Sequence, residues 1–99
     1  MGPKVERTMA IAVYFPVKNM PAKLYDQVME ELTGAGAGAP KGRLYHSAFG
    51  DPSGLRVFDV YDSPESFEAF GAILGAILAK HGIDTGEPMV QPMHNVVLG

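Results

Sequence analysis

The chain of 99 residues contains no cysteine and no run of lysine or arginine, and its formal net charge is -3. The absence of cysteine excludes a disulfide scaffold, thiol catalysis and a zinc site built on thiolates. It also permits a reducing compartment, so we expect a cytoplasmic protein. Without a basic cluster to contact phosphates, nucleic acid is not an expected partner.

The sequence also has no apolar run long enough to span a bilayer. The apolar segment 71–79 is too short to span a bilayer, and residues 1–8 lack the apolar region of a signal peptide, so we expect no membrane partner. Only 19% of the residues are charged, below the about 25% usual for soluble domains. Because 46% are hydrophobic, this balance favours a subunit of a larger assembly.

The first half of the chain predicts an arm, a strand, a helix and a loop. Residues 1–8 show no periodicity and are expected to form a flexible arm before a single domain at 9–99. The nearly continuous apolar run at 9–17 is typical of a central strand. Apolar residues at helical spacing predict a helix over 21–33. The Gly/Ala segment 34–42 is expected to be a mobile loop; it lacks a phosphate-binding pattern, so we expect no cofactor.

The second half predicts a hairpin, a helix and a final strand. Strands are expected over 43–49 and 55–61, joined by a turn rich in glycine and proline. The residues at 63–65, Ser-Pro-Glu, combine an N-cap, a first-turn proline and an acid, so they predict the start of a helix. This helix is expected to end at 80–82, and a last strand follows at 89–98.

The order of these elements is that of the ferredoxin-like βαββαβ fold, an α+β class with a four-stranded antiparallel sheet and two helices on one face. We expect Ile11, Val13 and Phe15 to face the helices. By alternation, the opposite face is then expected to carry Ala10, Ala12, Tyr14, Leu44, Ala48 and Val57. No segment remains to cover this apolar face, so we expect a homodimer that packs sheet against sheet as an α+β barrel.

His46 and Asp59 are the candidate catalytic residues. A turn centred near Pro52 sets them opposite each other on neighbouring strands, within reach of a direct contact. A histidine held by a carboxylate is a general base at neutral pH and needs no cofactor. The same pair is also explained as a buried polar pair that satisfies itself, and a register slip of one residue would separate it.

The substrate pocket is expected to be lined by Tyr14, Tyr61, His94, Ala12, Ala48 and Val57. Each tyrosine either donates a phenolic proton to an enolate or only lines the cavity. His94 points inward if the last strand is regular, whereas a bulge at Pro92 would turn Asn95 inward instead. Alternation along the strand expected over 43–49 predicts that Tyr45 faces the helices, opposite to Leu44.

A metal site is a further possibility for these side chains. His46, His94 and Asp59 together would resemble a set of two histidines and one carboxylate. The three residues have no sequence-local spacing that supports such a site, so we expect no metal.

The chain resembles the dimeric α+β barrel superfamily between Met9 and Leu98. The resemblance is carried by Ala10–Val17, Gly42–His46, Asp59–Phe67 and Met93–Val96. This superfamily includes antibiotic biosynthesis monooxygenase-like enzymes that use no cofactor, polyketide cyclases, muconolactone isomerases, heme-degrading enzymes and stress-induced proteins. A His-Asp dyad recurs in its YciI-like branch. The resemblance implies the fold and the dimer but no particular reaction.

Heme degradation is not implied, because the members that degrade heme share a pocket tryptophan and this chain has none. We expect a protein that binds a small apolar or aromatic molecule and performs cofactor-independent proton transfer on it, as a monooxygenase, cyclase or isomerase. The alternatives are a non-catalytic ligand-binding or stress-associated protein with an inert His-Asp pair, and a structural subunit without a cavity. A pocket that solvent reaches at His46 and Asp59 would favour the enzyme.

Overall fold

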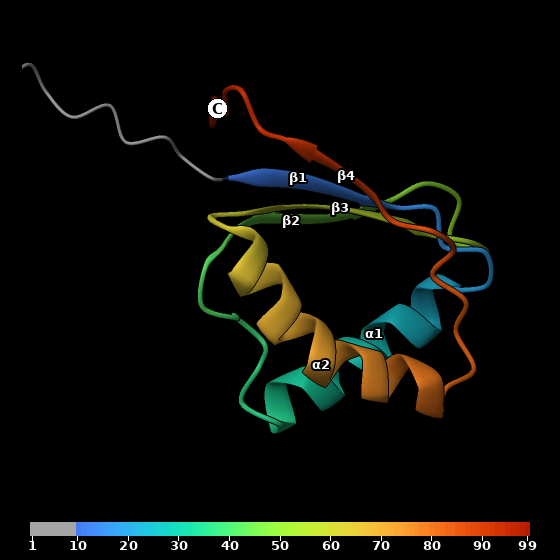
Figure 1. The fold of residues 1–99 in the computed structure, drawn as a ribbon. Coiled ribbons are helices and arrows are strands. Elements are labelled where there is room, and N and C mark those ends of the chain that lie inside the picture. The colour runs from blue at the N-terminus through green and yellow to red at the C-terminus, as the bar shows by residue number, and fades with distance from the viewer. Residues whose placement is uncertain (1–9) are drawn as a thin grey trace, which may run out of the picture.

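A computed structural model describes residues 10–99 as one antiparallel sheet with both helices on one of its faces (Figure 1). The elements are β1 (Ile11–Phe15), α1 (Ala22–Gly34), β2 (Arg43–Phe49), β3 (Arg56–Tyr61), α2 (Pro64–Lys80) and β4 (Met89–Pro92). The four strands are ordered β2-β3-β1-β4, so β2 and β4 form the edges. This confirms the predicted ferredoxin-like fold; the arm predicted at 1–8 lies outside the described residues.

Local sequence explains where α2 and β2 begin. The Ser63 side chain accepts a hydrogen bond from the backbone N–H of Ser66, and Pro64 occupies the first turn of α2. Gly42, directly before β2, has a φ of 88°, and a Cβ there would meet the Ser66 side chain. Glycine is therefore required at the entry to β2, where the chain passes under the start of α2.

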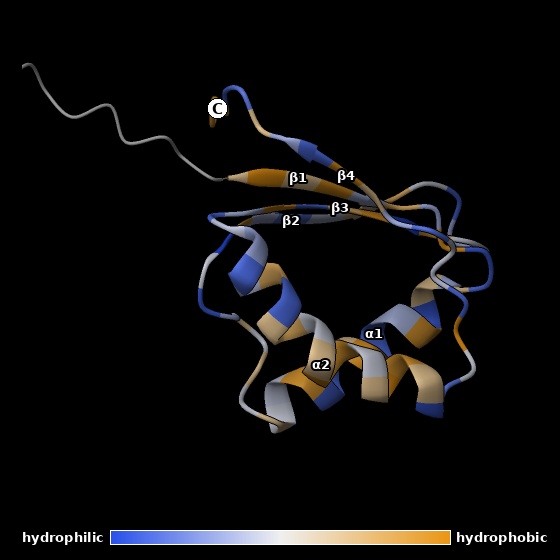
Figure 2. Ribbon diagram, viewed as in Figure 1, coloured by the Kyte–Doolittle hydropathy of each residue, from blue (hydrophilic) through white to orange (hydrophobic). Residues whose placement is uncertain are grey.

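The core lies between the helices and the sheet face toward them, where apolar segments meet (Figure 2). Ile11, Val13 and Phe15 point into it, as predicted. The other large buried apolar side chains of this core include Val28 and Leu32 from α1. Burial of these side chains is the main favourable term that holds the helices on the sheet.

Strand register corrects the predicted faces of β2 and β3. Phe15 pairs with Val57, which pairs with Ala48, and residues directly opposite each other share a face. Because Phe15 faces the helices, Val57 and Ala48 face them too, and not the opposite side as predicted. Leu44 lies in an irregularity of register between Arg43 and Tyr45 and is exposed.

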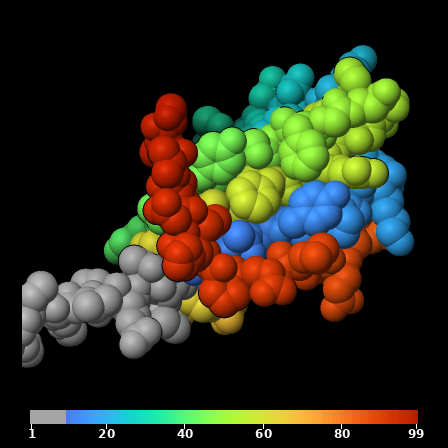
Figure 3. Space-filling model, turned by 90° about the horizontal axis from the view of Figure 1, so that it is seen from above, coloured from blue at the N-terminus to red at the C-terminus, as the bar shows by residue number. Residues whose placement is uncertain are grey.

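We call the sheet surface without helices the open face, and it carries Ala12, Tyr14, Tyr45, Phe49 and Phe58 (Figure 3). Ala12 and Tyr14 are there as predicted. Tyr45 was expected toward the helices, but it packs edge-on against Phe58 with the ring centroids 6.2 Å apart. The shift of register before Tyr45 places its side chain opposite to that of Arg43.

The last strand is shorter than predicted. β4 covers Met89–Pro92, on an edge of the sheet, and not the whole of 89–98. Pro92 has no N–H to continue the ladder, and its edge position agrees with this. Within residues 10–99, no helix has both the length and the apolar character needed to cross a membrane.

Candidate functional site

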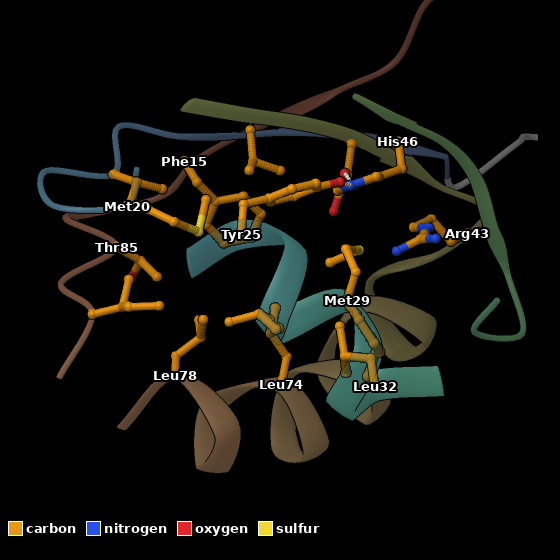
Figure 4. A pocket seen from close by; sticks show the side chains of 16 residues that line it. Phe15, Met20, Tyr25, Met29, Leu32, Arg43, His46, Leu74, Leu78 and Thr85 are labelled. Atoms are coloured by element: carbon orange, nitrogen blue, oxygen red, sulfur yellow. Dashed lines mark hydrogen bonds and ion pairs between the residues drawn. The ribbon is translucent and has the colours of Figure 1, made fainter. Parts of the chain in front are cut away.

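A cavity of about 40 Å³ lies between the two helices and the sheet (Figure 4). Most of its lining is apolar and comes from β1, α1, β3, α2 and the segment after α2. Its lining side chains are Phe15, Val17, Met20, Tyr25, Val28, Met29, Leu32, Arg43, His46, Val57, Asp59, Phe70, Leu74, Leu78, Ile83 and Thr85. A small apolar cavity with a few convergent polar groups is the usual form of a ligand site.

His46 and Asp59 meet in this cavity. They are direct partners in the β2–β3 register, and His46 Nδ1 lies 2.6 Å from Asp59 Oδ1. The predicted cross-strand contact is therefore present. Asp59 is only 2% exposed, whereas the His46 side chain is 18% exposed. The histidine is thus the member of the pair that solvent or a ligand reaches.

Two tyrosines extend the pair into a chain of four hydrogen-bonded side chains. Tyr25 Oη lies 2.6 Å from His46 Nε2, and Tyr61 Oη donates to Asp59 Oδ2 at 2.8 Å. A carboxylate only accepts hydrogen bonds, so Nδ1 of His46 carries the proton that faces Asp59. Nε2 of the neutral ring is then the acceptor for the Tyr25 hydroxyl.

Both tyrosine hydroxyls of this hydrogen-bonded network remain protonated at neutral pH. Burial raises the pKa of the Tyr25 hydroxyl, and the nearby positive charge of Arg43 opposes that effect. Burial also raises the pKa of the Tyr61 hydroxyl, and the negative charge of Asp59 adds to it. Each phenol is therefore a hydrogen-bond donor in this site.

Arg43 and Tyr25 are cavity residues that the sequence analysis did not identify. Tyr25 belongs to the apolar stripe of α1, and only its hydroxyl distinguishes it from the neighbouring side chains. Arg43 begins β2, and its guanidinium lies over the Phe70 ring with Cζ 5.6 Å from the centroid. Alternation along a regular strand would separate Arg43 from His46, but the irregularity of register brings both into the lining.

The other predicted pocket residues are dispersed. Val57 lines the cavity, whereas Ala48 packs beside the core without lining it, and Tyr61 is completely buried behind Asp59. Ala12 and Tyr14 do not reach the cavity, because they lie on the open face.

His94 and Asn95 are both exposed in the tail after β4, so neither points into the cavity. The tail leaves the sheet after Pro92, which removes the alternation on which their placement depended. The three-residue set with His46 and Asp59 is consequently not assembled: within residues 10–99, no group of three or more potential ligands is close enough to hold a metal.

No protein-family model matches the chain, and no curated protein matches it in sequence. Several solved structures share its fold. A proposed antibiotic biosynthesis monooxygenase from Chloroflexus aurantiacus superposes with a TM-score of 0.59 at 19% identity, over 91% of this chain and 99% of that chain. SnoaB, a cofactor-independent oxygenase from Streptomyces nogalater, gives 0.56 at 16% identity, over 89% of this chain and 94% of that chain.

A protein of unknown function from Nitrosomonas europaea is similar as well, with a TM-score of 0.58 at 18% identity, over 93% of this chain and 97% of that chain. At such low sequence identities, the similarity shows a shared fold and nothing further. It confirms the expected fold, which this chain shares with antibiotic biosynthesis monooxygenase-like proteins.

Proposed function

We propose that this protein is an enzyme that removes a proton from a small apolar or aromatic molecule bound between the sheet and the helices. The observation that carries this proposal is the orientation of His46. Its Nδ1 is held by the buried carboxylate of Asp59, and its Nε2 is directed into the cavity toward Tyr25. A histidine held in this way accepts a proton near neutral pH without a cofactor.

In the proposed reaction, a substrate hydroxyl or activated C–H takes the place of the Tyr25 hydroxyl at His46 Nε2. The proton moves to Nε2, and Asp59 stabilises the imidazolium that forms. Tyr61 holds the second oxygen of Asp59, so the carboxylate keeps its position during the transfer. The neutral hydroxyl of Tyr25 is then free to donate a hydrogen bond to the anion produced.

Among the reactions that begin with this step, we propose oxygenation of an electron-rich phenol. The support is the shared fold with SnoaB, which is described as a cofactor-independent oxygenase. A phenolate is more easily oxidised than a phenol, and the substrate itself supplies the four electrons that reduce dioxygen. One oxygen atom enters the ring as a quinone carbonyl, and the other leaves as water. Cyclisation and lactone isomerisation remain alternatives, because they begin with the same proton transfer.

The proposed assembly is a homodimer that buries the open face. Tyr45 and Phe49 are 42% and 44% exposed there, and Phe49 stacks on Tyr14 at 6.3 Å. Such a row of exposed aromatic rings is unusual on a monomeric protein. Two-fold pairing of this face with itself would remove the rings from water and close the barrel.

The alternative is a non-catalytic binding protein. One observation favours it: among residues 10–99, each buried side-chain nitrogen or oxygen has a hydrogen-bond partner. In particular, Tyr25 already occupies His46 Nε2. The hydrogen-bonded network of Tyr25, His46, Asp59 and Tyr61 is therefore also a stable structure without a substrate.

Oxygen uptake across a panel of hydroquinones and phenols tests the proposal. His46→Gln is expected to lower turnover by about 100-fold or more, the usual contribution of a general base. Asp59→Asn is expected to cost less, because the imidazole remains in place. His94→Gln is the matched control, since His94 is exposed in the tail, and it is expected to keep full turnover. Binding without turnover by the wild-type protein would support the non-catalytic alternative.

A further inference from the structure

We propose that the cavity selects an organic anion, whose ionised oxygen pairs with Arg43 while its apolar ring fills the space toward α2. This inference rests on the proposed function, because it takes the cavity at His46 as the place where the substrate binds. It adds the charge of the bound molecule, which the His46–Asp59 pair alone does not define.

Arg43 has no carboxylate partner within residues 10–99. The ion pairs in this part of the chain join His46 to Asp59 and Glu31 to Lys80 and His81. The guanidinium of Arg43 donates to the carbonyl oxygen of Gly38 at 3.2 Å, and its remaining N–H groups have no side-chain acceptor there. Arg43 is only partly buried, so water can hydrate these remaining N–H groups, and an anion that enters the cavity can replace that water as their acceptor.

The carboxylate of the cavity itself already has two hydrogen-bond partners. Asp59 Oδ1 contacts His46 and Oδ2 accepts from Tyr61, so neither oxygen pairs with Arg43. Asp59 is also almost fully buried behind the histidine. Asp59 lines the cavity too, but both of its oxygens are hydrogen-bonded, so Arg43 carries the charge that remains available to a ligand.

A turn and an irregularity of the strand bring Arg43 to this position. Gly42 turns the chain with a positive φ, and the irregularity of register after Arg43 breaks the alternation of β2. A bulge of this kind re-aims a side chain. The Phe70 ring then supports the guanidinium from one side. Arg43 is thereby placed beside His46 and Tyr25 in one lining (Figure 4).

The effect of Arg43 on Tyr25 shows what the guanidinium does to a phenol in this cavity. Its positive charge acts to lower the pKa of the Tyr25 hydroxyl, but burial and the negative charges of Asp59 and Asp26 together raise that pKa. Direct pairing with Arg43 is what would favour the ionised form of a substrate phenol in the cavity. The proton that His46 removes would then leave a phenolate that Arg43 stabilises by charge-assisted hydrogen bonds.

The size of the cavity limits the bound molecule to a single ring at most, and the lining has to expand to admit it. Its volume of about 40 Å³ leaves little free space, and its wall toward α2 is formed by Leu74 and Leu78. Met20 and Met29 line the cavity too, and their flexible side chains allow it to expand around a ring. A simple phenolate is therefore a suitable probe.

The test compares 4-nitrophenol, whose ionised form is coloured, with 4-nitrotoluene, a neutral molecule of the same shape. The wild-type protein is expected to bind the phenolate more tightly and to increase the ionised fraction of bound 4-nitrophenol. Arg43→Gln is expected to weaken phenolate binding by about tenfold or more and to leave 4-nitrotoluene binding unchanged. Arg56→Gln is the matched control, because Arg56 is exposed on β3 outside the cavity lining.

Arg43→Lys provides a second variant if Arg43→Gln does not fold. It keeps the charge without the fork of donors, and it is expected to retain part of the preference for phenolate. Equal binding of both probes by the wild-type protein would overturn the anion inference and leave the proposed proton transfer intact. Tight phenolate binding without turnover of any phenol would instead overturn the proposed function and support the anion site. Failure of the wild-type protein to bind either probe would overturn both.

Discussion

The hydroxyl of Tyr61 donates a hydrogen bond of 2.8 Å to Asp59, the residue two positions earlier on β3. Residues at this spacing share a face of the strand, so the contact follows from the local geometry. It occupies one carboxylate oxygen and leaves the other for His46. Tyr61 therefore supports the candidate base from behind and does not contact the cavity itself.

Replacement of Tyr61 by Phe is expected to lower the free energy of unfolding by about 1–3 kcal/mol, because Asp59 Oδ2 would remain buried without its donor. Tyr45→Phe is the matched control, because the Tyr45 hydroxyl is not in a buried network; both changes are made in a Phe49→Lys background, which removes the proposed dimer interface from the comparison. Urea unfolding measures both variants. Equal losses in the two variants would show that the Tyr61 hydroxyl does not support Asp59.

Alkaline pH is expected to destabilise the protein through Tyr25 and Tyr61. Burial raises the pKa of both phenols above the ordinary value of 10.0, so the folded state holds these protons more tightly than the unfolded state. Their contribution to stability is complete below pH 10.0 and is lost as the pH rises above it. Urea unfolding at several alkaline pH values measures this slope, and Tyr61→Phe is expected to make it shallower. An unchanged slope in that variant would contradict the assignment.

Light scattering at micromolar concentration is expected to give about twice the chain mass of 10.6 kDa. Phe49→Lys places a charge among the aromatic rings of the open face and is expected to yield monomers. Ile73→Lys is the matched control, because Ile73 on α2 is equally exposed, at 44%, and lies away from that face. A wild-type monomer with a well-dispersed spectrum, or dissociation by both variants alike, would exclude the proposed interface.

Amide exchange within the segment 34–42 is expected to differ from residue to residue. Ala37 is buried and its N–H donates to the Leu32 carbonyl, so we expect it to exchange slowly. Gly38 and Ala39 are exposed, and their N–H groups form no hydrogen bond within residues 10–99. We expect these two to exchange quickly, as for a loop that opens beside Arg43. Strong protection at Gly38 and Ala39 would contradict a mobile loop.

The sequence by itself determined the order of the elements and the meeting of His46 with Asp59. Apolar periodicity is a local property, and so are the Ser63 cap and the proline after it. The two residues of the dyad lie on one hairpin, where a short turn sets the register between neighbouring strands. Short-range geometry was enough for these features.

Only the tertiary structure decided which face the dyad occupies and which side chains join it. Alternation groups His46 with Ala48 and Asp59 with Val57, so the prediction that these faces are uncovered was wrong for the dyad as well. β1 and β3 are separated by α1 and β2, so the pairing of Phe15 with Val57 that turns the hairpin toward the helices is a non-local contact. Tyr25 reaches His46 because α1 packs across the sheet, and Arg43 joins the same cavity lining because β2 is irregular. These relations arise from packing between distant segments, and no pattern within a single segment encodes them.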